Sequence, residues 1–371
     1  MKKILLATAL LLAAMTARSQ DYTIPVTNIN QHGYPHIMPD LSLQFVMRAP
    51  DANLVQVDIC GVKYDLSKDE KGVWTGSTAP QVPGFHYYSI VIDGVSVADP
   101  ASESFYGCSR MMSAIDIPEA GCEDFEVKDV PHGQVRELRY YSKVTNSWRP
   151  VFVYTPASYE SGKKTYPVIY IHHGGGEDHR GWVEQGRTAN IMDNLIAAGK
   201  AKEAIVVSVN SNVPGRGGYS KEGMSAYASE LTENIIPFIE KTFRCKKDAK
   251  NRAMCGLSMG GGQSFYIGLP RPEVFRNIGI FSSGIFGGIQ GQSIDLEKEV
   301  PGMLSNTQGF NKGLDVFYIS CGEQDPRISH TKKYTDQMKA AGVKVYFNSF
   351  PGDHEWQVWR KSFHEFVQKI F

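Results

Sequence analysis

Ser258 stands in a sequence context that could make its hydroxyl a nucleophile. Residues 256–260 are Gly-Leu-Ser-Met-Gly, which is the G-x-S-x-G pattern. The preceding residues 251–255 can form a short apolar strand, and residues 261–269 have the character of a helix start. A serine between a strand and a helix lies on a sharp turn that exposes its side chain, and glycines on either side avoid collisions with neighbouring backbone. We therefore predict that Ser258 performs nucleophilic catalysis.

A serine hydroxyl is a weak nucleophile at neutral pH, so a base and an orienting carboxylate must accompany it. In proteins with this kind of turn, the order along the chain is serine, acid, histidine. Asp325 follows a β-rich run, and Glu323 in the same loop is its competitor because either carboxylate could hold an imidazole. His354 lies between a further predicted strand and the last predicted helix. We therefore predict that Ser258, Asp325 and His354 are the catalytic residues.

A glycine-rich loop could bind the negative charge that develops on a carbonyl oxygen. Residues 171–176 are Ile-His-His-Gly-Gly-Gly, and they follow a predicted strand. The amides of Gly175 and Met259 are the expected oxyanion-hole donors. The doubled His172-His173 departs from the usual single histidine, so the register could shift by one residue. A phosphate-binding loop is the alternative, but the segment lacks the G-K-[ST] ending and the G-x-G-x-x-G spacing of nucleotide sites.

The elements that must position these groups alternate between strand and helix. Strands are expected at 135–142, 147–154, 166–171, 251–255, 315–320 and 344–350, and helices at 189–200, 225–243, 328–341 and 356–371. Such alternation implies a mainly parallel sheet with helices on both faces, and catalytic groups belong at the carboxyl ends of its strands. We therefore predict an α/β-hydrolase domain over residues 135–371, opened by a hairpin that turns at 143–146.

Residues 21–117 have a different pattern, in which apolar and polar residues alternate. The alternation is clear in residues 41–48, 55–59 and 88–92, with turn residues between these runs. A period of two with short turns indicates an antiparallel β-sandwich of the immunoglobulin-like kind. Residues 118–134, which contain prolines and an acidic pair, are expected to link the two domains.

Composition argues against several classes of ligand. Lys plus Arg and Asp plus Glu number 39 each, which favours neither nucleic acid nor an anionic membrane surface and suits a neutral polysaccharide. No cysteine or histidine spacing fits a metal site, so we expect neither a metal nor an organic cofactor. The six cysteines are even in number, and Cys108 with Cys122, then Cys245 with Cys255, are the pairs to test for disulfides. The sequence does not indicate an oligomeric state.

The first 19 residues have the pattern of a secretory signal peptide. Two lysines precede the apolar residues 4–15, and residues 17–19 form a small-x-small cleavage site. A membrane-spanning helix needs about 20 apolar residues, more than this run contains. We therefore expect a secreted protein, periplasmic if the cell is Gram-negative, without a membrane anchor.

Several motifs together resemble carbohydrate esterase family 1 and the esterase D group, which include feruloyl and acetylxylan esterases. The similar segments are residues 149–156, 166–170, 173–176 with Trp182, 256–261, 321–325, and 352–354 with Trp359. The resemblance covers roughly residues 130–371. It implies a serine esterase acting on an acylated polysaccharide or oligosaccharide, with Ser258, Asp325 and His354 as its triad.

Residues 35–104 resemble the early-set immunoglobulin-like modules of carbohydrate-binding module family 48. The similarity rests on residues 48–52, 72–74, 83–88, 93–94 and 99–100. Trp74, Tyr87 and Tyr88 could stack on sugar rings, although aromatics of a small sandwich usually belong to its core. We expect a domain that packs beside the esterase and shapes its cleft, without placing a residue in the active site.

Other functions remain open at this stage. A siderophore esterase and a mycolyl-type acyltransferase share this fold and chemistry, and a carbohydrate-binding protein with an inactive hydrolase domain is the non-enzymatic alternative. The acyl group is also open, since the cleaved ester could be feruloyl, acetyl or another. A feruloyl group needs an apolar slot, for which Trp182, Trp356, Trp359 or the loop 212–224 are candidates.

Overall fold

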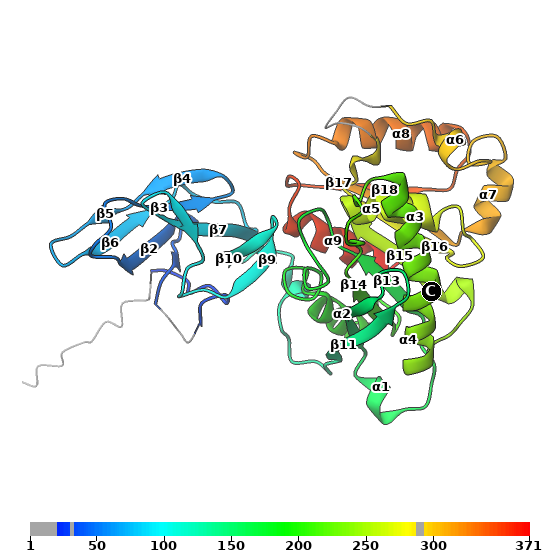
Figure 1. Cartoon of the computed structure of the whole chain (residues 1–371), viewed down its shortest axis with the longest axis horizontal. Coiled ribbons are helices and arrows are strands. Elements are labelled where there is room, and N and C mark those ends of the chain that lie inside the picture. Colours follow the sequence, from blue (N-terminus) through cyan, green and yellow to red (C-terminus); the bar gives the residue numbers. More distant parts are fainter. Residues whose placement is uncertain (1–20, 30–32, 287–292) are drawn as a thin grey trace, which may run out of the picture.

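Two lobes of different secondary structure lie side by side in the computed structural model, which describes residues 21–29, 33–286 and 293–371. The first lobe contains only strands, and the second has helices around a sheet (Figure 1). The predicted signal peptide falls outside the described residues. Within the described part of the chain, no helix has the length and apolar character needed to cross a membrane.

The first lobe is an antiparallel β-sandwich, as its alternating sequence predicts. One sheet has the order β1-β2-β6-β5, and the other has the order β4-β3-β7-β10-β9, with β8 paired to β7. Val55, Val57 and Ile59 of β3 point into the core while the residues between them are partly exposed. The strands are β1 His36–Ile37, β2 Leu43–Arg48, β3 Val55–Ile59, β4 Val62–Asp65, β5 Ser67–Lys68, β6 Val73–Ser77, β7 Gly84–Ile92, β8 Val95–Val97, β9 Ser104–Gly107 and β10 Arg110–Ile117.

The segment between the lobes lies against the second lobe and is held there by side chains. It contains a 3-10 turn, Glu123–Phe125. The amide of Asn194 donates to the carbonyls of Asp124 and Glu126, and Lys361 pairs with Glu119. These contacts tie the link to two different helices of the second lobe, so it is an ordered strap.

The second lobe is built on an eight-stranded sheet of order β11-β12-β14-β13-β15-β16-β17-β18. β11 and β12 form the predicted hairpin, β12 is antiparallel to β14, and every later neighbouring pair is parallel. The strands are β11 Gln134–Ser142, β12 Ser147–Thr155, β13 Val168–His172, β14 Ile205–Val209, β15 Arg252–Leu257, β16 Asn277–Phe281, β17 Val316–Gly322 and β18 Tyr346–Phe350. All residues of β13 to β17 are buried, because helices cover both faces.

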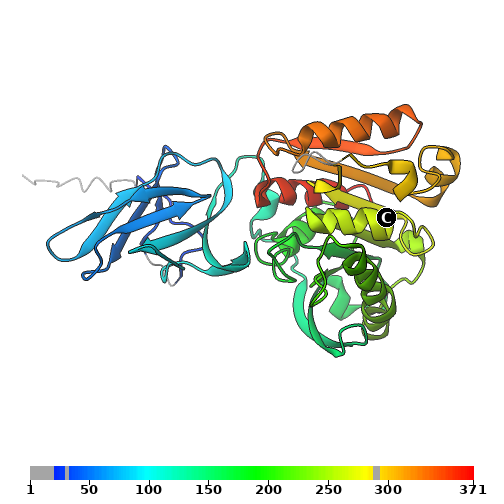
Figure 2. The same ribbon diagram turned by 45° about the horizontal axis from the view of Figure 1, so that its top comes forward.

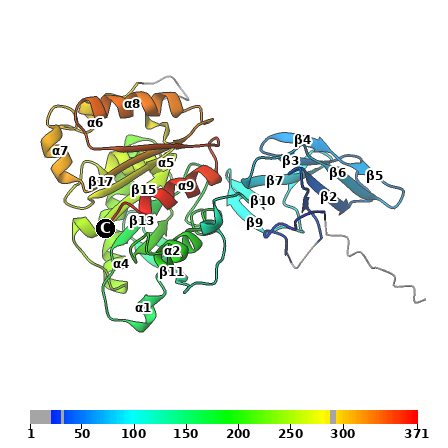
Figure 3. The same cartoon turned by 180° about the vertical axis from the view of Figure 1, so that it is seen from behind.

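The helices that cover the sheet are α1 Ser158–Ser161, α2 Thr188–Ala197, α3 Lys221–Ser229, α4 Ile236–Thr242, α5 Met259–Gln263, α6 Leu296–Glu299, α7 Thr307–Gly313, α8 Ile328–Ala340 and α9 Trp356–Val367. The single helix predicted over 225–243 contains a π segment, Glu230–Ile235, between α3 and α4. Pro237 near the start of α4 explains it, because proline has no N–H and its ring displaces the carbonyl of Glu233. Figures 2 and 3 show these helices layered on opposite faces of the sheet.

The apolar core on the α2 and α9 side continues into the first lobe. Phe85, Phe105 and Ala114 of the sandwich belong to the same buried cluster as Trp356 and Phe363 of α9. β7 packs directly against α9, which lies beside the sandwich in the view from behind (Figure 3). The two lobes therefore share apolar core residues at their interface, and this interface borders the edge of the sheet at which β15 ends.

Candidate active site

Ser258 occupies the sharp turn between β15 and α5. Its backbone angles, φ 50° and ψ −109°, lie in a region that side-chain-bearing residues rarely adopt. A Cβ on Gly256 would come within 2.7 Å of the His172 carbonyl oxygen, and one on Gly260 within 2.5 Å of the same atom. The two glycines are thus needed for β13 to pass close to the turn, as the sequence pattern predicts.

Asp325 and His354 meet at the carboxyl ends of β17 and β18. His354 Nδ1 lies 2.7 Å from Asp325 Oδ2, while Oδ1 accepts hydrogen bonds from the Arg327 amide at 3.0 Å and guanidinium at 2.8 Å. Burial of the carboxyl favours its neutral form, but its bonds to His354 and Arg327 outweigh this and lower the pKa of Asp325 to about 2. Asp325 is therefore a carboxylate at neutral pH, able to fix the histidine tautomer and stabilise an imidazolium.

Glu323, the alternative acid, lies elsewhere in the loop. Its side chain is exposed, and it accepts a hydrogen bond from the hydroxyl of Ser349 at 3.3 Å. The geometry thus favours Asp325 as the partner of His354.

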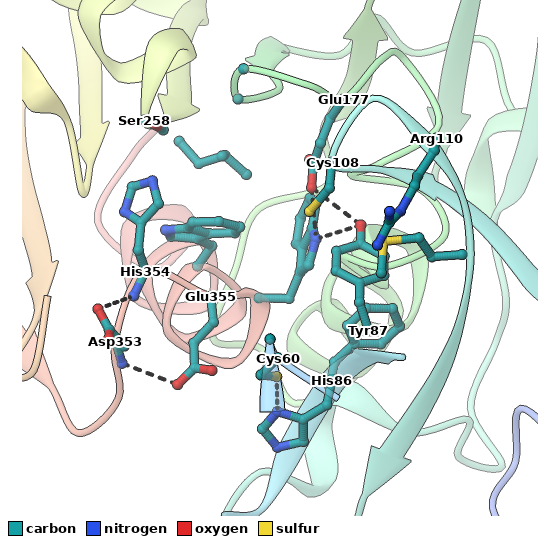
Figure 4. A pocket seen from close by; sticks show the side chains of 18 of the residues that line it. Cys60, His86, Tyr87, Cys108, Arg110, Glu177, Ser258, Asp353, His354 and Glu355 are labelled. Carbon is teal, nitrogen blue, oxygen red and sulfur yellow. Dashed lines mark hydrogen bonds between the residues drawn. The ribbon is translucent and has the colours of Figure 1, made fainter. Parts of the chain in front are cut away.

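Ser258 and His354 open into a cavity of about 520 Å³ between the two lobes. Figure 4 shows them on one side of it and sandwich residues, including Cys60, Tyr87 and Arg110, on the other. The second lobe supplies Gly174, Gly175, Glu177, Leu257, Ser258, Asp353, His354, Glu355, Trp356 and Trp359. The sandwich supplies Asp58, Cys60, Gly61, Phe85, His86, Tyr87, Cys108, Arg110 and Met112. The expectation that the first domain places no residue in the site is wrong, because the carboxyl edge of the sheet faces β7 and the β9–β10 turn.

The glycine-rich loop lies against the nucleophile, with its conformation held from both lobes. A Cβ on Gly174 would come within 3.4 Å of Ser258 Cβ, and Gly175 lines the cavity. The amide of Ser109, in the sandwich, donates to the carbonyl of Gly176 at 2.7 Å. Met259, whose amide is the second expected donor, is the first residue of α5 and is buried.

The two consecutive histidines, His172 and His173, are buried and hold the backbone of this loop through hydrogen bonds. Burial lowers the pKa of both His172 and His173 to about 4, so both rings are neutral. His172 Nδ1–H donates to the Cys255 carbonyl at 2.9 Å, and His173 Nδ1–H donates to the Gly174 carbonyl at 2.7 Å. Their role is to connect the loop to β15 and to hold its backbone.

The three tryptophans proposed as substrate contacts have different positions. Trp356 and Trp359 line the cavity, and the ring of Trp359 lies edge-on to His354 with centroids 5.0 Å apart. Trp182 is fully buried, and its indole N–H donates to the His172 carbonyl at 2.8 Å. Trp182 packs under Trp356 and, among the described residues, is not part of the cavity wall, because the loop that carries it folds back beneath β13.

Glu177 is a cavity residue that the sequence argument did not single out. Its Oε1 accepts hydrogen bonds from the Tyr87 hydroxyl at 3.2 Å and the Trp356 indole N–H at 3.0 Å. Burial raises the pKa of the Glu177 carboxyl to about 8. The available signal was its position directly after the oxyanion glycines, but only the contact with Tyr87 shows that it bridges the lobes.

Tyr219 is a second residue that the sequence did not single out. Its hydroxyl lies 3.5 Å from Ser258 Oγ, and its side chain is largely exposed. It belongs to the loop 212–224, which the sequence argument considered as a whole. Tyr219 thus places a partly exposed aromatic side chain next to the Ser258 hydroxyl.

All six cysteines are free thiols, so Cys108 is not joined to Cys122, nor Cys245 to Cys255. Cys60 and Cys108 line the cavity, and burial raises the pKa of Cys60 to about 11. A thiol of this kind is protonated at neutral pH and therefore a poor nucleophile. Over the residues described, no group of three or more His, Cys, Asp or Glu side chains could hold a metal ion.

Comparison with known proteins places this chain in a family. Residues 142–370 match the family model named Esterase and described as "Putative esterase". An endo-1,4-beta-xylanase/feruloyl esterase of Xylanibacter ruminicola is 34% identical over 374 residues, which is 97% of this chain and 49% of that protein. The chain therefore spans about half the length of this curated relative.

Solved structures share the fold. A CE1 ferulic acid esterase from Anaeromyces mucronatus, in complex with ferulic acid, is 27% identical with a TM-score of 0.58, over 68% of this chain and 96% of that one. The enterobactin esterase of Shigella flexneri is 15% identical with a TM-score of 0.65, over 88% of this chain and 92% of that one. The second similarity extends across both lobes, but at this identity it concerns the fold alone.

Proposed function

The chain belongs to the esterase family of carboxylic ester hydrolases, and from this premise we propose that it hydrolyses feruloyl esters on a plant cell-wall polysaccharide such as xylan. The names of the xylanase/feruloyl esterase relative and of the ferulic acid esterase structure support this substrate class. The observation that carries the proposal is the pairing of His354 with Asp325 beside Ser258 in a partly apolar cavity.

The size and lining of the cavity favour an aromatic acyl group over acetyl. A cavity of about 520 Å³ is in the range of small-molecule sites, and an acetyl group would leave most of it empty. Leu257, Trp356 and Trp359 give it apolar walls next to the nucleophile. A flat phenolic ring is the acyl substituent that such walls accommodate best.

In the proposed mechanism, Ser258 Oγ attacks the ester carbonyl as its proton passes to His354. Asp325 holds the imidazole in the required tautomer and stabilises the imidazolium. The amides of Gly175 and Met259 bind the oxyanion. His354 then gives this proton to the sugar oxygen as its bond to the acyl carbon breaks, and in the second half of the reaction it activates the water that hydrolyses the acyl-enzyme.

We also propose that the enzyme acts outside the cytoplasm. The basic, then apolar, then small-residue pattern of residues 1–19 supports export. An exported enzyme meets polysaccharide directly, whereas a polymer does not enter the cytoplasm. Detection of the mature protein, starting after residue 19 or 20, in the periplasmic or extracellular fraction would test this.

A substrate panel tests the function. The purified chain is assayed with methyl ferulate, feruloylated arabinoxylan and acetylated xylan, with the Ser258→Ala variant as the control for background hydrolysis. We expect ferulate release to exceed acetate release. Preferred cleavage of a catecholate triester would instead assign a siderophore esterase, the candidate that the fold shared with enterobactin esterase favours. Faster acyl transfer to an added sugar than to water would assign an acyltransferase.

A further inference from the structure

One tryptophan of this chain is exposed, in contrast to all the others. The side chain of Trp148 is 69% exposed, whereas Trp74, Trp182, Trp356 and Trp359 are between 0% and 6% exposed. Trp148 lies edge-on to Tyr141, itself 46% exposed, with ring centroids 5.7 Å apart. Large aromatic surface left in water is costly and often marks a place where something binds.

The pair lies on the side of the sheet where the parallel strands have their carboxyl ends, which is also the side where Ser258 lies. Ser142 pairs with Ser147 at the turn of the hairpin, and Val151 pairs with Val209 in antiparallel register. The beginning of β12 therefore lies next to the carboxyl end of β14, on the side where Ser258 follows β15. Three strand spacings separate β12 from β15, which corresponds to about 14 Å.

The hairpin is also connected to the rim of the active site. The guanidinium of Arg149 donates to the carbonyls of Asn210 and Asn212, both at 2.6 Å. These residues begin the loop that carries Tyr219, whose hydroxyl lies 3.5 Å from Ser258 Oγ. Exposed aromatic rings thus lie both beside Ser258, where Tyr219 is, and on the hairpin, where Trp148 is.

The sandwich does not offer its expected aromatics for the same purpose. Trp74 and Tyr88 are 5% and 0% exposed and belong to the sandwich core. Tyr87 is held in the interface, where its hydroxyl bonds to Glu177 and Gln185. Trp74 and Tyr88 cannot stack on a sugar without unpacking the domain, and Tyr87 faces the cavity beside Ser258 and not the outer surface.

We propose that Tyr141 and Trp148 form a platform for a pyranose ring of the polysaccharide main chain, three to four strand spacings (about 14–19 Å) across the sheet from the strand that leads to Ser258. The proposal rests on the proposed function, because the ligand is the unesterified glycan of the same substrate. A sugar ring presents C–H groups on its faces, which pack on an aromatic ring while its hydroxyls remain in water. Charge is not required, in keeping with a chain whose acidic and basic residues balance at 39 each.

Binding is measured without catalysis, in the Ser258→Ala background, by affinity electrophoresis in gels containing arabinoxylan stripped of its esters. Adding Trp148→Ala should weaken retention about tenfold, and Tyr141→Ala should weaken it less. Tyr346→Ala is the matched control, because Tyr346 is 54% exposed but lies on β18 at the opposite edge of the sheet. Retention of the Trp148 and Tyr141 variants at the level of the control would overturn the proposal.

Two further results separate this proposal from the proposed function. With Ser258 intact, Trp148→Ala should keep the wild-type kcat/KM on methyl ferulate and lose about tenfold on feruloylated arabinoxylan; equal losses on both would overturn the platform. If the wild type hydrolyses no feruloyl ester but Ser258→Ala still binds xylan through Trp148, the platform stands and the function falls. A wild-type dimer that Trp148→Ala turns into a monomer, in size-exclusion chromatography, would instead assign the patch to a second copy of the chain.

Discussion

The two walls of the cavity differ in how their residues are held. On the esterase wall, Ser258, Asp325 and His354 follow directly from strand ends, so the backbone of the sheet places them. On the sandwich wall, Tyr87 and Ser109 reach the site across an interface: the Tyr87 hydroxyl bonds to Glu177, Gln185 and Trp356, and the Ser109 amide donates to the Gly176 carbonyl. One lobe therefore supplies the proposed chemistry, while the other fixes the loop on which the oxyanion donors depend.

The interface that joins the walls contains charge as well as apolar surface. Asp116, at the end of the sandwich, pairs with Arg187 at 2.8 Å and with Arg360 at 2.9 Å, all three being largely buried. Loss of one member of such a cluster leaves unpaired buried charge, which is strongly destabilising. The sandwich is thus held against the esterase lobe by buried apolar and charged contacts, unlike a module that is attached only by a flexible linker.

The largest effect should come from the esterase wall itself. Ser258→Ala should lower kcat on methyl ferulate by about 10⁶-fold while the thermal unfolding temperature stays close to that of the wild type, since catalytic triads act as a unit. A fluorophosphonate should label the wild type at Ser258, seen by mass spectrometry, and leave the variant unlabelled. Activity of the variant near the wild-type level would refute the assignment of the nucleophile.

The acid of the same wall should come next. Asp325→Asn should lower kcat by about 10⁴-fold, because an amide favours the wrong histidine tautomer and cannot stabilise the imidazolium. Glu323→Gln is the matched control and should change kcat by less than about twofold, since its side chain is exposed. The reverse order of damage would assign the role of the acid to Glu323.

Removing the sandwich wall should have a smaller but still large effect. A fragment starting at Gln134 retains the triad and both oxyanion amides but loses the bonds from Ser109 and Tyr87. We expect kcat/KM on methyl ferulate to fall about 100-fold, because a shift of about 1 Å in a positioned group has this cost. The fragment exposes apolar interface, so circular dichroism and light scattering must first show that it is folded and monomeric. A folded fragment with the full-length rate would show that the sandwich wall is dispensable for small esters.

The smallest effect should come from Glu177, which connects the two walls, and it should appear as a dependence of the free energy of unfolding on pH. The pKa of Glu177 rises from 4.5 to about 8 on folding, so between these values the folded chain keeps a proton that the unfolded chain releases. The contribution of Glu177 to the free energy of unfolding should therefore fall as the pH rises through this window, whereas His172 and His173, whose pKa values burial lowers to about 4, contribute a rise up to about pH 6.5 in wild type and variant alike. Glu177→Gln, which cannot ionise, should lack this fall and be more stable than the wild type at pH 8 by a few kcal/mol.

Chemical denaturation at pH 5, 6.5 and 8 measures this difference, with Glu323→Gln as the control for loss of a surface carboxylate. A stability difference between Glu177→Gln and the wild type that does not change with pH would mean that Glu177 is ionised throughout. The control keeps Glu177 and both buried histidines, so its stability should follow that of the wild type across this pH range.

Local patterns in the sequence were sufficient to bring Ser258, Asp325 and His354 to one edge of the sheet, but they did not single out Glu177 of the same wall. The turn at Ser258 needs glycines at fixed neighbouring positions, and strand order places the acid and the histidine at one sheet edge. The hairpin before β14 was predicted in the same way, from two short strands and a turn. Pro237 marks where this approach failed in detail, since a helical pattern cannot show how its backbone will absorb a proline.

The rest was decided by tertiary structure, because it depends on residues far apart in the chain. Tyr87 and Trp356, which meet at Glu177, are 269 residues apart, and no local pattern predicts that contact. Burial likewise belongs to the fold: the sequence favoured the core for the sandwich aromatics, as Trp74 and Tyr88 confirm, but no pattern showed that Trp148 is exposed. The sequence by itself determined the two fold classes and predicted Ser258, Asp325 and His354 as a triad; packing of the lobes decided the second wall of the cavity, the pKa of Glu177 and which aromatic rings remain exposed.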